Sequence, residues 1–408
     1  MISECMELTE DEILKAHIGG KLSVELKNSL ETGRDLSVAY TPGVAKVCEK
    51  IVESPDAVNL YTNKNNTVAV VTDGSSVLGL GDIGASASIP VMEGKAVLFK
   101  RFGKVDSWPV PIENVRKDGV LDIDKFIEIV KAISPMYGGI NLEDIKAPEC
   151  FEIEDRLEKE LDIPVFHDDQ WGTAIIVLAA IKNYCILSEK DMEELKIVIN
   201  GAGAAGIRIA DMLKNSGAKN IFMVDSKGVC STTRSDINEF KVRHAVSSDE
   251  KTLFEVMESA DVFIGVSRGG CVTKEMIQSM NEYPAIFAMA NPVPEIYPED
   301  VREALVDKPY IMATGRSDYP NQINNVLGFP YIFRGALDAK AKKITMEMKL
   351  AASEALAKLA RDINIPDEIR KAHDRIDFKF GNDYIIPSPF DPRLIEVVAS
   401  AVRDAWKE

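Results

Sequence analysis

The sequence of 408 residues has few cysteines, a deficit of basic residues and no long hydrophobic run. The six cysteines are scattered, without a C-x-x-C pair or finger-like spacing, which argues against a disulfide framework and against a cysteine metal site. Lys and Arg number 48 against 65 Asp and Glu, which gives a formal net charge of −17. Because such a surface repels phosphate backbones, nucleic acid and anionic membranes are excluded as partners.

No segment is apolar for long enough to suggest a membrane span. The densest apolar run, residues 174–181, is far too short for a bilayer and is typical of a buried helix. The N-terminal residues 1–7 are acidic where a secretory signal would be basic, and no long apolar segment follows them. We therefore expect a cytoplasmic protein with reduced thiols and no membrane partner.

The composition is that of an ordinary globular protein, with 46% hydrophobic and 28% charged residues. A chain of this length is expected to form two or three domains. We place an N-terminal catalytic domain at residues 1–165, a dinucleotide-binding domain at 166–335 and a C-terminal segment at 336–408.

The second half of the chain alternates strand-like and helical runs. Strands are predicted at 195–200, 220–225, 261–266, 285–290 and 310–314. Amphipathic segments lie between them at 206–216, 253–259 and 274–280. Alternating strands and helices with right-handed crossovers predict a parallel sheet covered on both faces, which is a doubly wound, Rossmann-type α/β fold.

The flanking segments predict a smaller N-terminal α/β domain and a C-terminal helix with an arm. Apolar residues at 68–72 and helical spacing at 124–133 belong to the first part. Residues 336–361 are rich in Ala, Lys, Met and Leu, which predicts one long helix. The proline-containing tail at 383–392 is expected to pack on the first domain as an ordered extended arm.

The strongest local motif is a glycine-rich loop between a predicted strand and a predicted helix. It has the form G-x-G-x-x-G, and the next strand ends in Asp225 roughly 20 residues further on. Its glycines allow a tight turn and a close approach to a pyrophosphate at the helix N-terminus. We predict that a dinucleotide contacts Asp225 and the loop residues Gly201, Ala202, Gly203, Ala204, Ala205 and Gly206.

Two acidic pairs follow apolar runs that are predicted to be adjacent strands. They are Glu143-Asp144 and Asp168-Asp169, and carboxylate oxygens suit Mg²⁺ or Mn²⁺. Side chains alternate along a strand, so Glu143 and Asp144 share one ion only if the chain twists as it leaves the sheet. The residues alone favour the alternative, in which these are solvated acids at strand ends.

Three further features carry a weaker signal. The glycine-rich stretch at 72–84 suggests a turn that a ligand approaches closely, although a plain surface loop is an equal alternative. Tyr40 and Lys95 are single residues, and a core or surface role is the simpler interpretation for each when it is taken alone.

Taken together and in this order, these segments resemble the malic enzymes, in particular the short prokaryotic type. The resemblance covers nearly the whole chain. It rests on residues 39–45, 72–74, 78–82, 93–95, 141–144, 166–170, the loop 201–206, and residues 291–292, 322–325 and 385–391.

The resemblance implies oxidative decarboxylation of (S)-malate to pyruvate and CO₂, with reduction of NAD(P)⁺ and a requirement for Mg²⁺ or Mn²⁺. It implies that Lys95 takes the proton of the C2 hydroxyl and that Tyr40 returns a proton to C3. Asp168 would tune Lys95. The implied metal ligands are Glu143, Asp144 and Asp169.

The same resemblance implies that Asn291 and Asn325 hold the substrate, with Asn324 nearby and Asn291 also close to the cofactor. Longer family members carry a basic residue after Thr-Asp-Gly, where this chain has Ser75-Ser76. Substrate binding there would use hydroxyl and backbone N–H groups, or a cation from elsewhere. The resemblance and the apolar N-terminal helical region also predict a homodimer.

Cofactor choice depends on the end of the second strand of the dinucleotide domain. Asp225 can accept hydrogen bonds from the ribose hydroxyls and repel a 2′-phosphate, which favours NAD over NADP. Lys227, Arg234 and Lys241 in the following segment argue for NADP, because any of them could pair with a phosphate.

Three other functions stay open. A relative that decarboxylates oxaloacetate with little net hydride transfer would use the same residues. A metal-free amino-acid dehydrogenase also places a lysine before a dinucleotide domain, but it has no use for the acidic pairs. A non-enzymatic nucleotide sensor would need neither Tyr40 nor Lys95.

Overall fold

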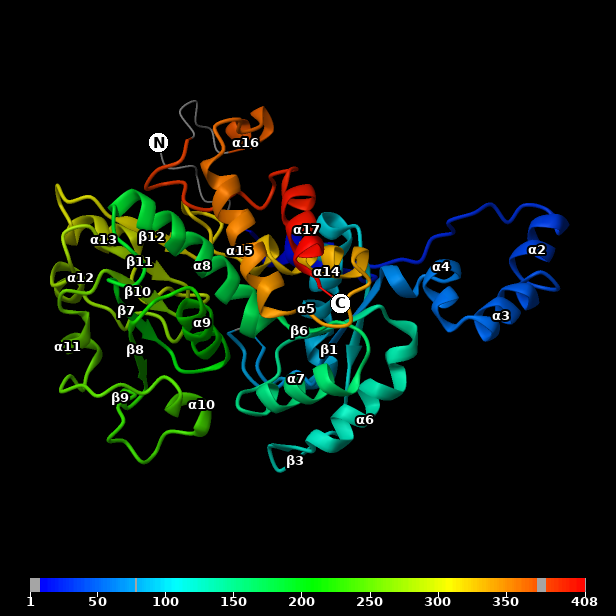
Figure 1. Cartoon of the computed structure of the whole chain (residues 1–408), viewed down its shortest axis with the longest axis horizontal. Coiled ribbons are helices and arrows are strands. Elements are labelled where there is room, and N and C mark those ends of the chain that lie inside the picture. Colours follow the sequence, from blue (N-terminus) through cyan, green and yellow to red (C-terminus); the bar gives the residue numbers. More distant parts are fainter. Residues whose placement is uncertain (1–7, 78, 373–378, 408) are drawn as a thin grey trace.

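The computed structural model describes residues 8–77, 79–372 and 379–407 (Figure 1). The acidic N-terminal residues 1–7 and Leu78 of the glycine-rich stretch lie outside these described residues. The chain builds two main sheets, with strand orders β2-β1-β5-β6 and β12-β11-β10-β7-β8-β9. The fold is therefore α/β, as predicted.

The first sheet is parallel throughout, and β1, β5 and β6 are buried along their whole length. Its strands are β1 (Thr67–Thr72), β2 (Asp106–Pro111), β5 (Gly139–Leu142) and β6 (Val165–His167). The associated helices are α5 (Gly84–Leu98), α6 (Ile123–Ile133) and α7 (Glu149–Glu160), and a small hairpin joins β3 (Arg116–Lys117) to β4 (Val120–Leu121). The predicted helix at 124–133 is confirmed as α6.

The second sheet is the predicted doubly wound sheet, in which five parallel strands end within two residues of their predicted bounds. They are β7 (Lys196–Asn200), β8 (Asn220–Asp225), β10 (Val262–Gly265), β11 (Ala285–Ala288) and β12 (Ile311–Thr314). An antiparallel edge strand, β9 (Gly228–Val229), was not predicted. The helices are α9 (Ala204–Asn215), α10 (Glu239–Val242), α11 (Leu253–Met257), α12 (Lys274–Gln278) and α13 (Pro298–Ala304).

One long helix, α8 (Asp168–Ser188), leads from the first sheet to the second. By length and composition it could cross a membrane, but 67% of its most apolar window is buried inside the protein. It packs against α9 and against the C-terminal helix α15 (Met346–Arg361). The apolar run at 174–181 is therefore the predicted buried helix.

The C-terminal segment differs from the prediction of one helix over 336–361. Helix α14 (Phe329–Asp338) ends before Lys340, which adopts a left-handed φ of 50°. Thr345 then caps α15 by accepting a hydrogen bond from the Met348 N–H. The long-helix prediction is wrong because alanine-rich composition does not reveal this interruption. Helices α16 (Asp367–Ala372) and α17 (Leu394–Ala405) follow.

The tail at 383–392 is an ordered arm. The Ile385 N–H donates to Asn321, and the Ile385 carbonyl accepts a hydrogen bond from Asn183 of α8. The first sheet with its helices is hereafter the first unit, and the second sheet with its helices is the dinucleotide unit. Further along the arm, the centre of the Phe390 ring lies 6.1 Å from the centre of the Phe102 ring in the first unit. The arm therefore joins both units of the chain.

The domain boundaries placed from the sequence remain predictions. Strand β6 pairs in the first sheet, so the boundary after residue 165 passes through this strand. The boundary before residue 336 falls inside helix α14, and the Phe333 ring of this helix lies 5.4 Å from the Phe99 ring of the first unit. The two units therefore share elements along their junction.

Three helices form a segment that projects from the rest of the chain (Figure 1). They are α2 (Gly33–Ala39), α3 (Val44–Glu53) and α4 (Val58–Tyr61), preceded by α1 (Glu10–His17). None of the four contains a buried residue. The five short helical turns are η1 (Pro55–Ala57), η2 (Lys64–Asn66), η3 (Phe99–Gly103), η4 (Ser134–Met136) and η5 (Asn325–Leu327).

Candidate active site

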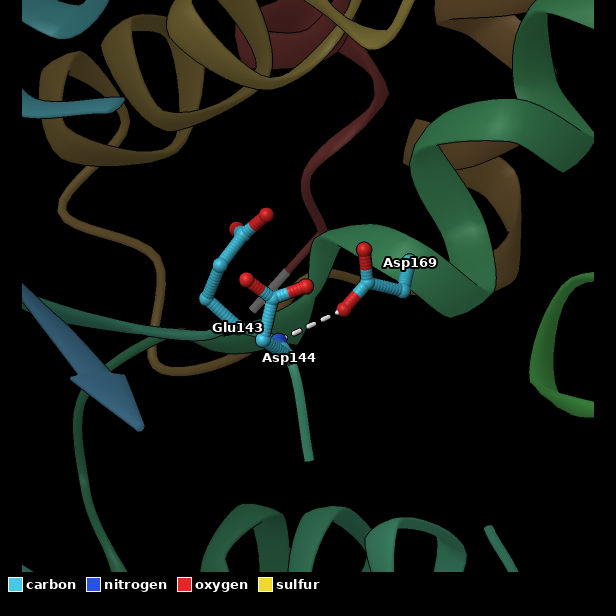
Figure 2. Close-up of side chains that lie close together, drawn as sticks. All are labelled: Glu143, Asp144 and Asp169. Atoms are coloured by element: carbon cyan, nitrogen blue, oxygen red, sulfur yellow. Dashed lines mark hydrogen bonds between the residues drawn. The ribbon is translucent and has the colours of Figure 1, made fainter. Parts of the chain in front are cut away.

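The predicted metal ligands meet at the carboxyl ends of β5 and β6, which are adjacent parallel strands. Glu143 and Asp144 follow β5 directly, and Asp169 lies in the first turn of α8. Figure 2 shows the three side chains together, and one carboxylate oxygen from each lies within 4.8 Å of the others. The Asp144 N–H donates to Asp169 Oδ2 at 2.7 Å. These three residues are hereafter the acidic cluster.

The chain twists at Asp144, as a shared site for two consecutive residues requires. The φ of Asp144 is +53°, a left-handed conformation that residues other than glycine seldom adopt. Such backbone strain tends to persist where the surrounding structure holds it for function. Glu143 and Asp144 are each only 4% exposed. The alternative of solvated acids at strand ends is therefore wrong for Glu143 and Asp144, while the Asp169 side chain is 34% exposed.

Lys95 and Asp168 lie beside the acidic cluster. The Lys95 ammonium is 2.6 Å from Asp168 Oδ2 and 2.9 Å from Glu143 Oε1. Burial alone would lower the pKa of Lys95, but attraction by Asp168, Glu143 and Asp169 outweighs it and raises that pKa. The predicted neighbours therefore meet, and the side chain of Asp168 is fully buried in that contact.

The donor set suits a hard divalent cation. Burial, followed by repulsion from Asp169, raises the pKa of Asp144 to about 8. Burial also raises the pKa values of Glu143 and Asp169. The Asp144 Oδ2 atom is buried without a hydrogen-bond partner among the described residues. Four carboxyl groups around one ammonium group leave an excess of negative charge that a bound Mg²⁺ or Mn²⁺ would balance.

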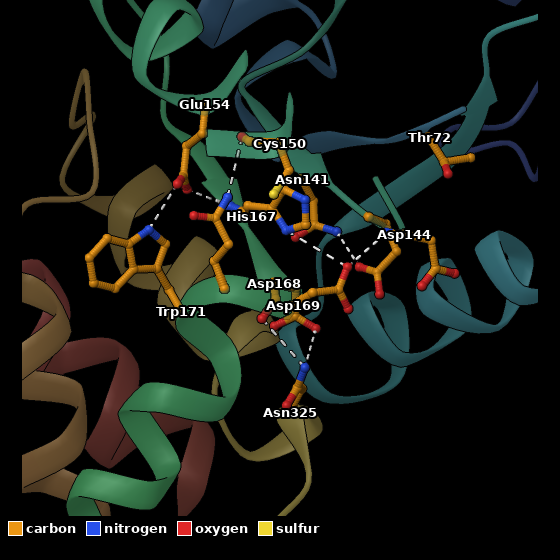
Figure 3. A network of polar contacts seen from close by, with 12 residues as sticks. Thr72, Asn141, Asp144, Cys150, Glu154, His167, Asp168, Asp169, Trp171 and Asn325 are labelled. Carbon is orange, nitrogen blue, oxygen red and sulfur yellow. Dashed lines mark hydrogen bonds and ion pairs between the residues drawn. The ribbon is translucent and has the colours of Figure 1, made fainter. Parts of the chain in front are cut away.

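Only one of the two consecutive asparagines reaches this site. Asn325 donates to Asp168 Oδ2 at 3.1 Å (Figure 3). The side-chain carbonyl of Asn325 accepts a hydrogen bond from the Thr173 hydroxyl. The Asn324 carbonyl instead accepts from the Val326 N–H and caps η5. Asn324 therefore belongs to the scaffold that presents Asn325, and Thr173 is a supporting residue that the sequence did not indicate.

Tyr40 is not brought to Lys95 within this chain. It ends α2 in the projecting segment, and its side chain is 67% exposed. No hydrogen bond among the described residues links it to the acidic cluster. Among the described residues of one chain, Tyr40 and Lys95 therefore do not meet, because the N-terminal helices extend away from the first sheet (Figure 1).

The dinucleotide loop has the predicted geometry. Gly201 has a φ of +130°, and a Cβ atom there would lie 2.5 Å from the Val266 carbonyl oxygen. A Cβ at Gly206 would lie 1.7 Å from the Gly201 carbonyl oxygen. In contrast, a Cβ at Gly203 would meet nothing within 4 Å. The outer glycines therefore form the turn, and Gly203 leaves its backbone open to a ligand. Ala202 and Gly203 lead into α9, which begins with Ala204 and Ala205 and contains Gly206.

Asp225 ends β8, but its carboxylate is not free. Arg234 donates to both of its oxygens, at 2.8 and 3.1 Å, and Lys241 donates at 2.7 Å. The Lys227 N–H adds a fourth hydrogen bond. Burial opposes ionisation of Asp225, but the hydrogen bonds from Arg234 and Lys241 outweigh it and lower its pKa to about 2.

The loops of the two units approach each other beside the site. Asn291 follows β11 and is exposed, and a Cβ at Gly79 of the first unit would lie 3.5 Å from the Pro292 ring. Asn291 thus lies where the units meet, and its side-chain amide donates to the Met289 carbonyl at 3.4 Å.

A cation from elsewhere reaches the Ser75-Ser76 turn. Arg116 of β3 donates to Asp73 Oδ2 at 2.7 Å and to the Ser75 hydroxyl at 3.0 Å. The Ser76 N–H donates to the Asp144 carbonyl, which connects this turn to the acidic cluster. Arg116 was not identified from the sequence, since it lies in no motif.

Comparison with known proteins agrees with this geometry. Residues 19–158 match the family "Malic enzyme, N-terminal domain", and residues 171–369 match "Malic enzyme, NAD binding domain". An NADP-dependent malic enzyme of Halomonas elongata is 50% identical over 95% of this chain and 90% of its own length. An NADP-dependent malic enzyme of Rhizobium meliloti is also 50% identical, but this chain spans only 52% of it. This chain spans about half the length of several curated relatives that it matches.

Solved structures give the same result. The NAD-dependent malic enzyme of Thermotoga maritima superimposes with a TM-score of 0.86 at 43% identity, covering 97% of this chain and 99% of that one. Both halves of the chain match one family, in the expected order. This chain therefore belongs to the malic enzyme family.

Proposed function

We propose that this chain oxidises (S)-malate to pyruvate and CO₂ and reduces NAD(P)⁺, with Mg²⁺ or Mn²⁺ as a required ion. The observation that carries the proposal is the Lys95 ammonium, held by Asp168 and Glu143 at the edge of the acidic cluster. A base beside an ion site and across from a dinucleotide loop is what oxidation followed by decarboxylation of a 2-hydroxy acid requires.

Each residue then has a defined task. Glu143, Asp144 and Asp169 would hold the ion, which would supply Lewis-acid chemistry for the oxidation and decarboxylation of the 2-hydroxy acid. Lys95 would take the proton of the C2 hydroxyl as a neutral amine, because the positive charge of an ion at the acidic cluster would lower its raised pKa. The hydride from C2 would pass to NAD(P)⁺. Asp168 orients the Lys95 ammonium, and Asn325 holds Asp168. Asn291 is assigned to substrate and cofactor because it lies where the two units meet.

We infer that the cofactor site accepts NADP, contrary to the preference for NAD expected from the sequence. That expectation depended on an Asp225 carboxylate free to meet the ribose hydroxyls and repel phosphate. In the fold, Arg234 and Lys241 both contact that carboxylate. Asp236 also pairs with Arg234, and Lys227 pairs with Asp236, so this cluster holds three cations and two carboxylates. Its excess positive charge favours an approaching 2′-phosphate.

We also propose a homodimer in which Tyr40 acts on the substrate bound by the partner subunit. The projecting segment exposes Leu36, Val38, Tyr40, Leu60 and Tyr61, each by more than half. A group of exposed apolar side chains of this size is typical of an interaction surface. A second copy would cover the segment and supply the proton donor that the Lys95 site lacks within its own chain.

Mixing two inactive variants tests this arrangement. Tyr40→Phe and Lys95→Ala are each expected to be inactive as homodimers. If Tyr40 acts across the interface, a mixed dimer has one intact site and regains about half the wild-type activity. No recovery in purified mixed dimers would show that both residues act within one chain.

The overall reaction is tested by initial rates with malate, each dinucleotide and Mn²⁺. Equal amounts of pyruvate and reduced dinucleotide are expected. Pyruvate formed from oxaloacetate without oxidation of malate would instead identify the decarboxylase alternative. Oxidation of an amino acid without added metal would identify the dehydrogenase alternative.

We further propose that the protein is cytoplasmic and acts on a small molecule rather than on nucleic acid. The acidic composition supports this. So do the described cysteines Cys48, Cys150, Cys185, Cys230 and Cys271, all of which are free thiols. Fractionation of cells that produce the protein would test the location.

A further inference from the structure

A buried carboxylate that the mechanism does not use lies behind the acidic cluster. Glu154 of α7 is 1% exposed. Its Oε1 atom accepts a hydrogen bond from the His167 N–H at 2.9 Å, and its Oε2 atom accepts one from the Trp171 indole at 3.1 Å (Figure 3). Glu154 therefore holds the backbone and the side chain on either side of Asp168 and Asp169.

The cation that faces Glu154 comes from the dinucleotide unit. Arg208 lies on α9, five positions after Gly203 of the dinucleotide loop, and is 7% exposed. Its guanidinium is 3.4 Å from Glu154 Oε2 and 4.6 Å from the centre of the Trp171 ring. An arginine within the apolar run Ile207-Arg208-Ile209 is a sequence signal for such a contact, because a buried charge needs a partner.

Arg208 also contacts the C-terminal end of the segment 167–170, which contains Asp168 and Asp169. Its Nε atom donates to Gln170 Oε1 at 2.8 Å, and Gln170 follows Asp169 directly. The Glu154–Arg208 ion pair thus contacts His167 before Asp168 and Gln170 after Asp169. A shift of α9 relative to the first unit would pull on the segment that carries a metal ligand and the partner of Lys95.

We propose that Glu154 and Arg208 are positioning residues that couple dinucleotide binding at the loop before α9 to ion binding at Asp169. The inference rests on the proposed function. A ligand that fixes α9 in place also fixes the segment 167–170. The second ligand then loses less free energy in ordering this segment when it binds. Thermodynamic linkage then requires that each ligand tighten the other by the same factor.

The chemistry of the pair supports this role over simple stabilisation. A buried ion pair gives little net stability compared with apolar side chains of the same volume, because both charges lose their hydration. The apolar alternative would still fill the space between Phe151 and Trp171, whose rings lie 5.2 and 4.6 Å from the guanidinium. Apolar side chains would not form the directional hydrogen bonds to the His167 N–H and to the Gln170 side chain.

The experiment measures binding rather than turnover. NADP⁺ is titrated into the full-length protein with and without saturating Mn²⁺, and Mn²⁺ is titrated with and without NADP⁺. In the wild type we expect each ligand to lower the Kd of the other about fivefold or more. Arg208→Met removes the ion pair between the units but leaves Glu154 with its two N–H donors. We therefore expect that neither ligand changes the Kd of the other in this variant, while its melting curve stays cooperative.

Asp211→Asn is the matched control. Asp211 contacts the same guanidinium at 3.2 Å, but it lies on α9 itself and touches neither His167 nor Gln170. This variant is expected to keep the mutual effect. If Arg208→Met does not fold, Glu154→Gln serves as the second variant, because it keeps the side-chain volume and one acceptor.

Two results would overturn the inference. One is a folded Arg208→Met or Glu154→Gln protein in which Mn²⁺ still tightens NADP⁺ by the wild-type factor. The other is a wild type that oxidises malate but binds Mn²⁺ and NADP⁺ independently. The second result would leave the proposed function intact, since turnover is measured separately.

Discussion

Two charged clusters, each at the end of a parallel strand, shift the pKa of an aspartate in opposite directions. After β5, Asp144 lies among other carboxyl groups with a single ammonium nearby, and its pKa rises to about 8. At the end of β8, Asp225 faces two cations, and its pKa falls to about 2. The same residue type thus belongs to a cation site in one sheet and to an anion-tolerant site in the other. The neighbours, not the position in the sheet, decide which ligand each aspartate suits.

The largest test of this comparison removes the ammonium from the first cluster. Lys95→Ala is expected to lower malate oxidation by about 10²-fold or more, because the base is lost. Dinucleotide binding and a cooperative melting curve in the presence of Mn²⁺ are expected to remain. A variant within a few-fold of the wild-type rate would exclude Lys95 as the base.

The next test removes one carboxylate charge from the same cluster. Asp169→Asn is expected to raise the Mn²⁺ concentration needed for half-maximal activity at least about tenfold, because an amide is a weaker ligand for a hard cation. The Mn²⁺ dependence of the initial rate measures this. Asp124→Asn serves as the control, since Asp124 is an exposed carboxylate of α6 that pairs with Arg156. Unchanged metal dependence in Asp169→Asn would exclude Asp169 as a ligand.

A smaller effect is expected when a cation is removed from the second cluster. Lys241→Met should weaken NADP⁺ binding about tenfold and change NAD⁺ binding little, because a hydrogen bond to a charged group contributes roughly 1.5–3 kcal/mol. The ratio of kcat/KM for the two dinucleotides measures the change. Equal losses for both would show that Lys241 only holds Asp225, and a wild type that favours NAD would restore the preference expected from the sequence.

The smallest effect concerns a carboxyl group outside both clusters. Burial raises the pKa of Glu158 to about 7, from an ordinary value of 4.5. The folded protein therefore holds this proton more tightly than the unfolded chain, and its contribution to stability is lost as the pH rises from about 4.5 to 7. Melting temperatures at pH 5 and pH 8 should differ less in Glu158→Gln than in the wild type. An identical difference would contradict the raised pKa.

Local patterns predicted much of the fold because they record which side chains face a core. The strand at 220–225 was found to the residue, since its apolar run is bounded by turn residues on both sides. The interruption at Lys340 was missed, because lysine carries no signal for a left-handed backbone. Strand β9 was missed as well, since two residues are too few to show alternation.

The candidate site was predicted only as far as its motifs extend. Glu143, Asp144, Asp169 and Lys95 lie in family motifs, and the structure brings them together. Arg116, Glu154 and Arg208 lie outside those motifs and reach the site through contacts between elements distant in the sequence. Tyr40 is the opposite case, because it lies in a family motif that implied a catalytic role, but within one chain it lies away from Lys95.

The sequence by itself determined the family, the parallel sheet of the second half and the residue types that the chemistry needs, because periodicity and short motifs are properties of neighbouring residues. Only the tertiary structure decided how each charge is balanced. Whether Asp225 repels a phosphate depends on where Arg234 and Lys241 fold back, 9 and 16 residues later. Electrostatic interactions depend on distance in space and on burial, and neither can be read from the order of residues along the chain.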